Sequence, residues 1–547
     1  MTLGEEDKIS HALISSQRDI CYTEDEAPEI ETTTKTTRFY ISIAAIVVAL
    51  FLVTLDLVIL PASLPAITQD LKATSSQAYW CGTGYIIAQA ASQPIFGIIS
   101  VICGRKLMLQ ISLLIFMVAS IMCARAQSIE WLIGTRVMQG LGGGGITALT
   151  IMVVTDLTSL QERSKWMSIL SLSYAFGNVG LVLGAAITEF TTWRWVYYIN
   201  IPVCVILLAV LQLSLHLQPK IENHHNGLLK FDWAGIAILG GSASTLLLGL
   251  LSGGVSHPWS SAAIIAPLVI VIGVIGLVCF AIVEYFALMP MFPRELLKSR
   301  TFNAASLISF VGGYAVTSLA FFLIVYFHGA AGYGVIHSAV AVLLTIILVP
   351  AGGIISGVII TKSGDYRGPL YFGCAAVTAG MSSLTVLSPL SSVGLQTGLQ
   401  IPIGIGLGFI YIASNIAPQA TLPSHLHAVS VNQITFTRVM GQAFGIAIGG
   451  AIFQNQFDNY VNNHVRDGSL SDGFRVRGKD AELAFTRIDQ FPQQVSDVYS
   501  AIYCDSLRAV WFTGMALSAV ALLCCLSTQK ASLGRDLTAN RRLPSSK

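Results

Sequence analysis

Long apolar runs separated by short polar connections make up most of this chain. Each run holds roughly 20 residues, the length that a helix needs to cross the hydrocarbon core of a bilayer. Short segments of alternating polarity, which a membrane barrel requires, are absent from the sequence. The pattern therefore predicts an all-α polytopic membrane protein with about fourteen transmembrane helices. The expected spans are 40–60, 78–99, 107–124, 132–153, 167–188, 196–214, 233–252, 262–283, 303–327, 338–360, 370–388, 395–416, 433–453 and 508–527.

Composition supports the same class. Hydrophobic residues make up 54% of the chain and charged residues only 11%, with a mean hydropathy of +0.69. Soluble proteins carry about 25% charged residues, so the bilayer is the expected surrounding of this chain. The net charge of +2 and the lack of a basic stripe in the sequence argue against a nucleic-acid partner.

The positions of Lys and Arg predict the orientation, because cytosolic connections carry an excess of both. With the N-terminus inside, the short external connections hold only Lys72, Arg125 and Arg194. We therefore expect cytosolic N- and C-termini and a location in the cell membrane, with the vacuolar membrane as the alternative. The cations of the expected cytosolic side are Arg105, Lys106, Arg163, Lys165, Lys220, Lys230, Arg294, Lys298, Arg300, Lys362, Arg367, Lys530, Arg535, Arg541, Arg542 and Lys547.

Short motifs recur eight spans apart, which indicates an internal repeat. The recurring positions are Gly97 and Gly104 with Gly357 and Gly364, and Ala-Phe-Gly at 175–177 with 443–445. Two six-helix halves around an inserted pair explain these offsets, and parallel halves are one plan of secondary transporters. We expect a disordered cytosolic tail at 1–39, a first half at 40–214, a cytosolic linker at 215–231, an inserted helix pair at 232–284, a second half at 285–527 with an external loop at 454–507, and a cytosolic tail at 528–547.

Several segments between residues 40 and 455 carry recognisable motifs. An acid and two prolines mark the first span at 55–65, and Arg-Val-Met-Gln-Gly-Leu-Gly-Gly-Gly occupies 136–144. The other segments are Trp80–Tyr85, Asp156, Glu162 with Arg163, Trp193–Pro202 and Phe231–Trp233. Together these motifs resemble the major facilitator superfamily, and within it the fourteen-span drug:proton antiporter branch common in fungi.

The resemblance implies a secondary transporter with alternating access, not an enzyme. Its substrate would be a small amphipathic organic compound, exported by a monomer against an inward flow of protons, with no cofactor. The sequence contains no Gly-x4-Gly-Lys-Ser/Thr loop for ATP and no zinc-type cysteine spacing. An uncoupled or uptake facilitator of the same superfamily is the first alternative. A non-transporting membrane sensor is the second, although the short C-terminal tail argues against it.

Asp56 is the only acid deep in the first half, where a charge is costly and usually lines a polar cavity. It is our candidate for binding a proton or a cationic group. Arg136 and Gln139 share one helical face with Gly140 and Gly143, whose small size lets a neighbouring helix approach. Arg136 either pairs structurally with Asp56 or takes part in proton transfer, and the family resemblance favours proton transfer.

The second half has a similar face in its fifth helix. Arg438 and Gln442 are the candidates there for the cavity wall. In the fifth span of the first half, Gly177, Gly180 and Gly184 form a helix-packing stripe. The superfamily usually has a proline within this stripe, and Leu181 replaces it here, so we expect a straighter helix.

The connection 97–106 is expected to be the gating loop, with Gly97, Gly104, Arg105 and Lys106 as its members. Asp156 and Arg163, in the next connection on that side, are expected to act with it. The resemblance implies an acid and an arginine at 101 and 102 that latch the halves in the outward-facing state. Valine and isoleucine stand there instead, so we expect a weaker latch. His425 and His427 are expected to be solvated in a cytosolic loop, with no metal site.

Restoring the acid with Val101→Asp is expected to shift the conformational balance toward the outward-facing state, because the carboxylate can form the missing charged contact. Cysteine accessibility on the two sides of the membrane measures that balance. An accessibility pattern identical to that of the wild type contradicts the assignment of this loop.

Overall fold

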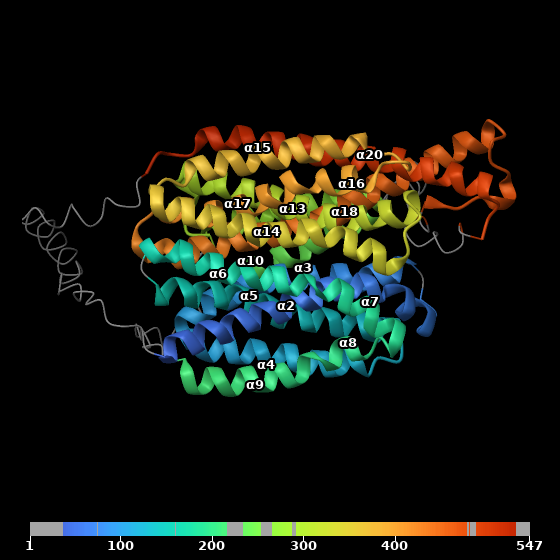
Figure 1. The fold of residues 1–547 in the computed structure, drawn as a ribbon. Helices are drawn as coiled ribbons and strands as arrows, with labels where there is room; N and C mark the ends of the chain where they lie inside the picture. Colours follow the sequence, from blue (N-terminus) through green and yellow to red (C-terminus); the bar gives the residue numbers. More distant parts are fainter. Residues whose placement is uncertain are drawn as a thin grey trace, which may run out of the picture.

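The fold is known from a computed structural model, which describes residues 37–73, 75–158, 160–215, 233–252, 265–286, 292–478 and 490–531, together with 481 and 488. The described residues form an elongated bundle of roughly parallel helices (Figure 1). Of the expected segments, residues 1–36 and 532–547 of the tails, all of the linker 215–231 after residue 215, and parts of the inserted pair lie outside the described residues. We call the end of the bundle where α2 begins and α20 ends the terminal end, and the opposite end the cap end.

Helices form where the apolar runs predict them. The first half contains α2 (Thr37–Asp70), α3 (Ser75–Cys103), α4 (Arg105–Ala124), α5 (Ile129–Leu157), α6 (Leu160–Asn178), α7 (Gly180–Phe190), α8 (Trp195–Tyr198) and α9 (Asn200–Ser214). The inserted pair is α10 (Trp233–Ser252) and α11 (Ile265–Phe286). The second half contains α12 (Arg294–Lys298), α13 (Arg300–Val325), α14 (Val335–Ser363), α15 (Arg367–Ser383), α16 (Val393–Gly398), α17 (Gln400–Gln419), α18 (His427–Arg466) and α20 (Gln493–Cys524).

Ten of the described helices are long and apolar enough to cross a membrane. The other expected spans coincide with α3, with α6 and α7 together, and with the inserted pair. Large apolar side chains point outward along the bundle, among them Ile206 (61% exposed) and Ile275 (55%). These surfaces are typical of contact with lipid. The all-α prediction is confirmed, and the count of fourteen spans stays a prediction.

The internal repeat is visible in the backbone. Gly104 and Gly364, which are equivalent in the repeat, both have a positive φ, of 92° and 66°. Each turns the chain between the second and third helices of its half, in a region that favours glycine. Gly177 packs against Thr54 of α2, and its counterpart Gly445 packs against α13, so both contact the first helix of their own half.

The glycine stripe holds α6 and α7 against α2. A Cβ on Gly177 would lie 2.5 Å from the Cβ of Thr54, and one on Gly184 would lie 2.5 Å from the carbonyl oxygen of Ile59. Only residues without a side chain allow this approach. The helical assignment breaks at Val179, but its φ of −59° and ψ of −19° keep the chain in helical geometry.

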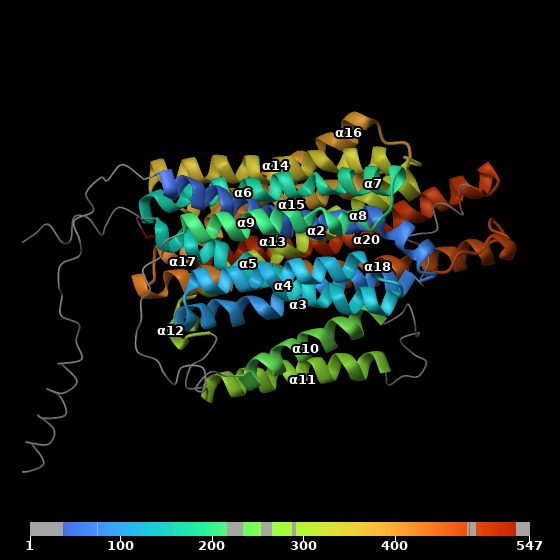
Figure 2. The same cartoon turned by 90° about the horizontal axis from the view of Figure 1, so that it is seen from below.

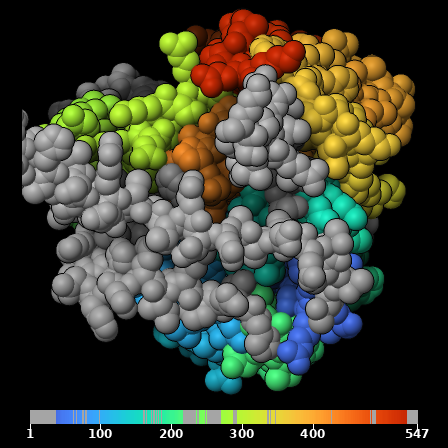
Figure 3. All heavy atoms as spheres, turned by 90° about the vertical axis from the view of Figure 1, so that its left-hand side faces the viewer, coloured from blue at the N-terminus to red at the C-terminus, as the bar shows by residue number. Residues whose placement is uncertain are grey.

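Helices of the two halves contact each other: α6 and α7 pack on α14, and α3 and α5 pack on α18. Near the terminal end, Arg163 and Ser168 of α6 form hydrogen bonds to the second half. Seen from the terminal end, the blue-to-teal first half and the yellow-to-red second half occupy opposite sides of the molecule (Figure 3). The inserted pair lies at one side of the bundle (Figure 2), and its helix α10 contacts both α3 and α18.

At the cap end, α18 and the connection to α20 project beyond the bundle (Figure 1). The expected external loop 454–507 is therefore shorter than predicted, because residues up to Arg466 continue α18 and residues from Gln493 begin α20. The connection packs on aromatic side chains of these helices. The Tyr499 hydroxyl donates to the carbonyl of Phe474 at 2.7 Å and accepts from the N–H of Val476 at 3.0 Å.

Candidate functional site

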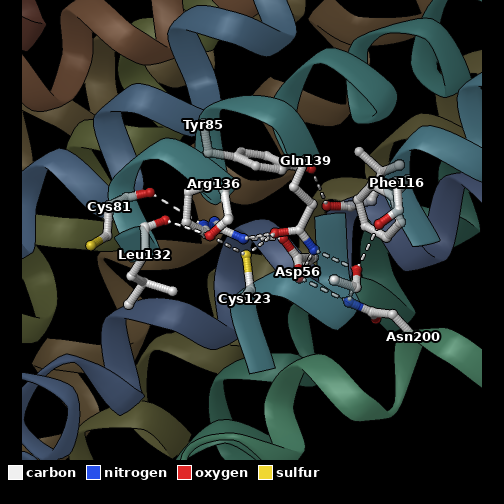
Figure 4. Close-up of polar contacts among 12 residues, drawn as sticks. Asp56, Cys81, Tyr85, Phe116, Cys123, Leu132, Arg136, Gln139 and Asn200 are labelled. Carbon is white, nitrogen blue, oxygen red and sulfur yellow. Dashed lines mark hydrogen bonds and ion pairs between the residues drawn. The ribbon is translucent and has the colours of Figure 1, made fainter. Parts of the chain in front are cut away.

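Asp56 and Arg136 form an ion pair in the interior of the first half (Figure 4). Asp56 comes from the middle of α2 and Arg136 from α5, and they are 1% and 0% exposed. A buried carboxylate or guanidinium alone costs several kcal/mol, and an opposite charge in contact offsets this cost. The sequence-predicted pairing of these two residues is thus present in the structure.

Two further side chains bind the carboxylate of Asp56, and Ser120 in turn binds their amides. The Gln139 side-chain amide donates to Oδ1 at 2.9 Å, and the Asn200 amide, at the start of α9, donates to the same oxygen at 3.0 Å. The Ser120 hydroxyl of α4 accepts from Gln139 Nε2 at 2.9 Å. Four helices, α2, α4, α5 and α9, therefore meet at one acid. Sequence reasoning found Gln139 and missed Asn200 and Ser120.

The guanidinium of Arg136 is fixed from several sides. Its Nε donates to the carbonyl of Cys81 on α3 at 3.2 Å, and its Nη1 donates to Gln139 Oε1 at 2.7 Å. The Cζ atom lies 4.3 Å from the centre of the Tyr85 ring, a cation–π contact that strengthens in a desolvated site. Nη2 has no hydrogen-bond partner among the described residues. One donor of this buried cation thus stays unused in this conformation.

Gly140 and Gly143 make this arrangement possible. A Cβ on Gly140 would lie 2.3 Å from the carbonyl oxygen of Tyr85, and a Cβ on Gly143 would lie 2.7 Å from the Tyr85 hydroxyl. The two glycines therefore bring α5 against α3, which places Arg136 within reach of both the Tyr85 ring and Asp56. This close approach is the packing against a neighbouring helix that their small size favours.

The second-half candidates lie on a different surface. Arg438 of α18 is 4% exposed, and its Cζ lies 4.7 Å from the centre of the Tyr411 ring on α17. The backbone carbonyl of Gln442 accepts a hydrogen bond from Thr317 of α13 at 2.8 Å. The shared face of Arg438 and Gln442 therefore packs on α13 and α17 rather than beside Asp56, in the other half.

The gating-loop candidates gather at the terminal end. Gly104 begins α4, Arg105 pairs with Asp156 of α5, and Lys106 Nζ donates to the carbonyl of Gln212 on α9 at 2.8 Å. These contacts hold helices of the first half to one another. Val101, at the position of the missing acid, is 55% exposed.

Arg163 and Gly97 instead contact the second half. Arg163 Nη1 donates to Gln419 of α17 at 2.5 Å and lies 3.3 Å from His427 Nδ1. A Cβ on Gly97 would lie 2.4 Å from the amide nitrogen of Asn432 on α18. Sequence reasoning missed Gln419, His427 and Asn432, because no local signal marks a partner in the other half.

At the cap end, the Trp-Arg motif fastens α2 to the start of α8. Trp193 Nε1 donates to Asp70 at 2.9 Å, and Arg194 donates to the same carboxylate at 2.8 Å. These two bonds hold the pKa of Asp70 below its usual range, the Trp193 bond first and the Arg194 bond second. The motif thus has a structural role.

No cluster of three or more metal-ligating side chains occurs among the described residues. The buried site offers a carboxylate, a guanidinium and neutral amides, a set suited to holding a proton and to moving a charge between helices.

The model of the Major Facilitator Superfamily matches residues 46–450. The chain belongs to this superfamily. Membership agrees with the two repeated halves and with the buried acid in a membrane-spanning helix. It makes this chain a multi-pass membrane transporter.

Curated members of the superfamily match nearly the whole chain. The "MFS-type efflux pump LUC4" of Fusarium sp is 30% identical over 522 residues, which are 94% of this chain and 92% of the relative. "Efflux pump FUS6" of Gibberella moniliformis is 31% identical over 518 residues, 93% and 91% of the two chains. "MFS efflux transporter aclA" of Aspergillus oryzae is 31% identical over 501 residues, 90% of each.

Solved structures of other transporters share the fold. A bacterial homologue of the human lysosomal transporter Spinster, inward-facing and unoccupied, aligns with a TM-score of 0.56 at 14% identity, covering 90% of this chain and 98% of that one. The human organic anion transporter MFSD10 aligns with the same TM-score at 12% identity, covering 90% and 100%. At such identities the likeness concerns the fold alone.

Removing one charge of the buried pair is expected to destabilise the transporter more than removing both. Asp56→Asn leaves Arg136 uncompensated, which costs about 3–5 kcal/mol. The double variant Asp56→Asn with Arg136→Met leaves no unpaired charge and is expected to be more stable than Asp56→Asn alone. Thermal unfolding in detergent measures the difference.

Asp505→Asn is the matched control, because Asp505 forms an exposed ion pair with Arg508 at 2.7 Å and such pairs contribute about 0–1 kcal/mol. Additive losses in the double variant would show that the two buried charges do not depend on each other.

Proposed function

We propose that this chain is a proton-coupled exporter of a small amphipathic organic compound that works by alternating access. The buried Asp56–Arg136 pair is the observation that carries the proposal. A transporter that only binds a neutral compound has no need of two charges inside the bilayer, where each is costly. A role in transport explains both charges if the Asp56 carboxylate releases Arg136 when it binds a proton.

The contacts of the pair suggest how proton binding moves helices. When Asp56 takes up a proton, its attraction to Arg136 is lost, and the guanidinium must find new acceptors. Arg136 belongs to α5, whereas Asp56 belongs to α2. Proton binding therefore loosens α5 from α2, while Gln139 and Asn200 can still hold the neutral acid. Because α5 also contacts α18 of the second half, its displacement is passed on to the interface whose opening and closing alternating access requires.

We further propose that the terminal end faces the cytosol. Predicted cytosolic cations lie at this end of the described structure: Arg105, Lys106, Arg163, Arg294, Lys298, Arg300, Lys362, Arg367 and Lys530. Such an excess is typical of the cytosolic side. Because the halves are joined by hydrogen bonds near this end, the described conformation is closed toward the cytosol.

The substrate class follows from the relatives and from the surroundings of the interface. Three relatives carry the word efflux in their names. The interface of the halves contains a neutral amide, that of Asn432 on α18, which lies beside Gly97 of α3 and is 2% exposed. Amides beside aromatic and apolar side chains suit compounds with few charges.

An uncoupled facilitator is the second candidate. The exposed Val101 in place of the expected acid favours it, because the outward-facing state then lacks a charged latch. Asp56 and Arg136 would be purely structural in that case.

Purified protein in liposomes under an imposed pH gradient is expected to move rhodamine 6G, and related amphipathic compounds, against the direction of proton flow. Asp56→Asn is expected to lose the gradient-driven component, since Asn cannot bind a proton, while Asp505→Asn retains it. Fluorescence of the dye measures the flux.

Equal gradient-driven transport by wild type and Asp56→Asn would show that Asp56 is not the proton site. Transport that ignores the pH gradient in both proteins would favour the uncoupled facilitator.

A further inference from the structure

Arg163 joins the two halves through a single guanidinium. Its Nη2 donates to two carbonyls of its own half, those of Thr155 at 2.9 Å and Thr158 at 3.2 Å. Its Nη1 reaches into the second half, to Gln419 and to the ring of His427. Arg163 is 7% exposed, so these bonds are shielded from water and are stronger than surface contacts.

The bonding of His427 defines the protonation state of its ring. Nε2 lies 3.0 Å from the carbonyl oxygen of Leu422, which can only accept a hydrogen bond. Nδ1 lies 3.3 Å from Arg163 Nη1, which can only donate one. Both contacts are hydrogen bonds only if Nε2 carries the proton and Nδ1 is bare. The closed interface therefore contains a neutral histidine.

A second proton on the ring reverses the contact with Arg163. Nδ1 would then present a donor to a donor, and two positive charges would face each other at hydrogen-bond distance in a shielded site. Separation of the halves relieves this repulsion, because α6 carries Arg163 and α18 carries His427. Protonation thus disfavours the closed interface and leaves the separated state unpenalised.

The described contacts place neutral groups and one further acid around this hydrogen bond. α17 contributes the neutral Gln419, and α18 contributes the hydroxyl of Ser430, which donates to the His427 carbonyl at 2.8 Å. Asp156 of α5 acts electrostatically on Arg163, but its carboxylate also pairs with Arg105. Arg163 is therefore the charged group whose hydrogen bond to the ring is made or broken.

We propose that His427 is a proton-sensing residue of the cytosolic closure: the neutral ring holds the two halves together, and protonation of the ring from the cytosol opens them. The expectation of a solvated loop histidine is replaced by this role. Acidification of the cytosol would then bring the transporter into the state that loads substrate from inside. The switch depends on the proposed orientation but not on the substrate or on proton antiport.

The sign of the pH effect follows from the geometry. Histidine takes up its second proton near pH 6.5. Above this pH the closed interface keeps its hydrogen bond, and below it the open population is expected to rise, by up to about tenfold per pH unit. The neutral ring in the closed state is the reason that acid opens the interface rather than closing it.

Spin labels on the full-length chain in nanodiscs test the proposal without substrate or gradient. Cysteines at Leu107 of α4 and Lys362 of α14, both exposed at the terminal end, place one label on each half, after replacement of the native exposed cysteines by serine. Double electron–electron resonance then gives the fraction of separated halves between pH 8 and pH 5.5. We expect wild type to open on acidification and His427→Gln to stay at its pH 8 distribution.

Two controls separate the switch from other protonation events. His464→Gln alters a histidine at the other end of α18 and is expected to open like wild type. Arg163→Gln removes the repelling charge and is expected to lose the pH dependence. If His427→Gln folds poorly, as judged by size-exclusion chromatography, His427→Asn replaces it. Opening of His427→Gln on acidification like wild type, or a wild-type distance distribution that does not change with pH, overturns the proposal.

Discussion

A carboxylate and a guanidinium that are buried away from water are stable only as a pair, and Asp56 of α2 and Arg136 of α5 form such a pair. The penalty for an unpaired charge in this interior is several kcal/mol. This penalty favours arrangements in which α2 and α5 keep the two charges in contact. Asn200 and Gln139 bind the same carboxylate, so α9 takes its position from the same acid. The packing of the first half thus depends on one electrostatic contact.

The second half, and the interface that joins it to the first half, are held by other kinds of contact. Arg438 rests on an aromatic ring, and the interface is held by one guanidinium, by amides and by glycine contacts. Apart from the bonds of the Arg163 guanidinium, these contacts join neutral groups and are weaker than paired charges. An interface that must open and close in each cycle benefits from being weak, whereas the core of a rigid half does not. Val101, which cannot form a charged contact between the halves, is consistent with a weak interface.

Much of this architecture is readable from the sequence, for identifiable reasons. Asp56 and Arg136 stand out because charges are rare in apolar runs. Gly177 and Gly184 stand out because their spacing places them on one face of a helix. Both signals are local, and these residues lie where α2 packs on its neighbours.

Contacts between distant segments left no such local signal. Asn200 follows an aromatic segment and looks like part of a helix start, yet its amide reaches Asp56. His427 sits in a polar connection, and only the packing of α6 against α17 and α18 shows that it meets Arg163. Residues 454–507 mix charges with Asn and Gln, a composition typical of a loop, yet residues up to Arg466 continue α18 and residues from Gln493 begin α20. Tertiary packing, not local periodicity, decides these features.

Infrared difference spectroscopy of the reconstituted protein during a pH step tests most directly whether the buried pair binds the transported proton. The account predicts a carboxylic-acid carbonyl band that appears on acidification in the wild type and is missing from Asp56→Asn, while Asp505→Asn retains it. The same band at full intensity in Asp56→Asn would contradict the account, because the proton would then reside on another group.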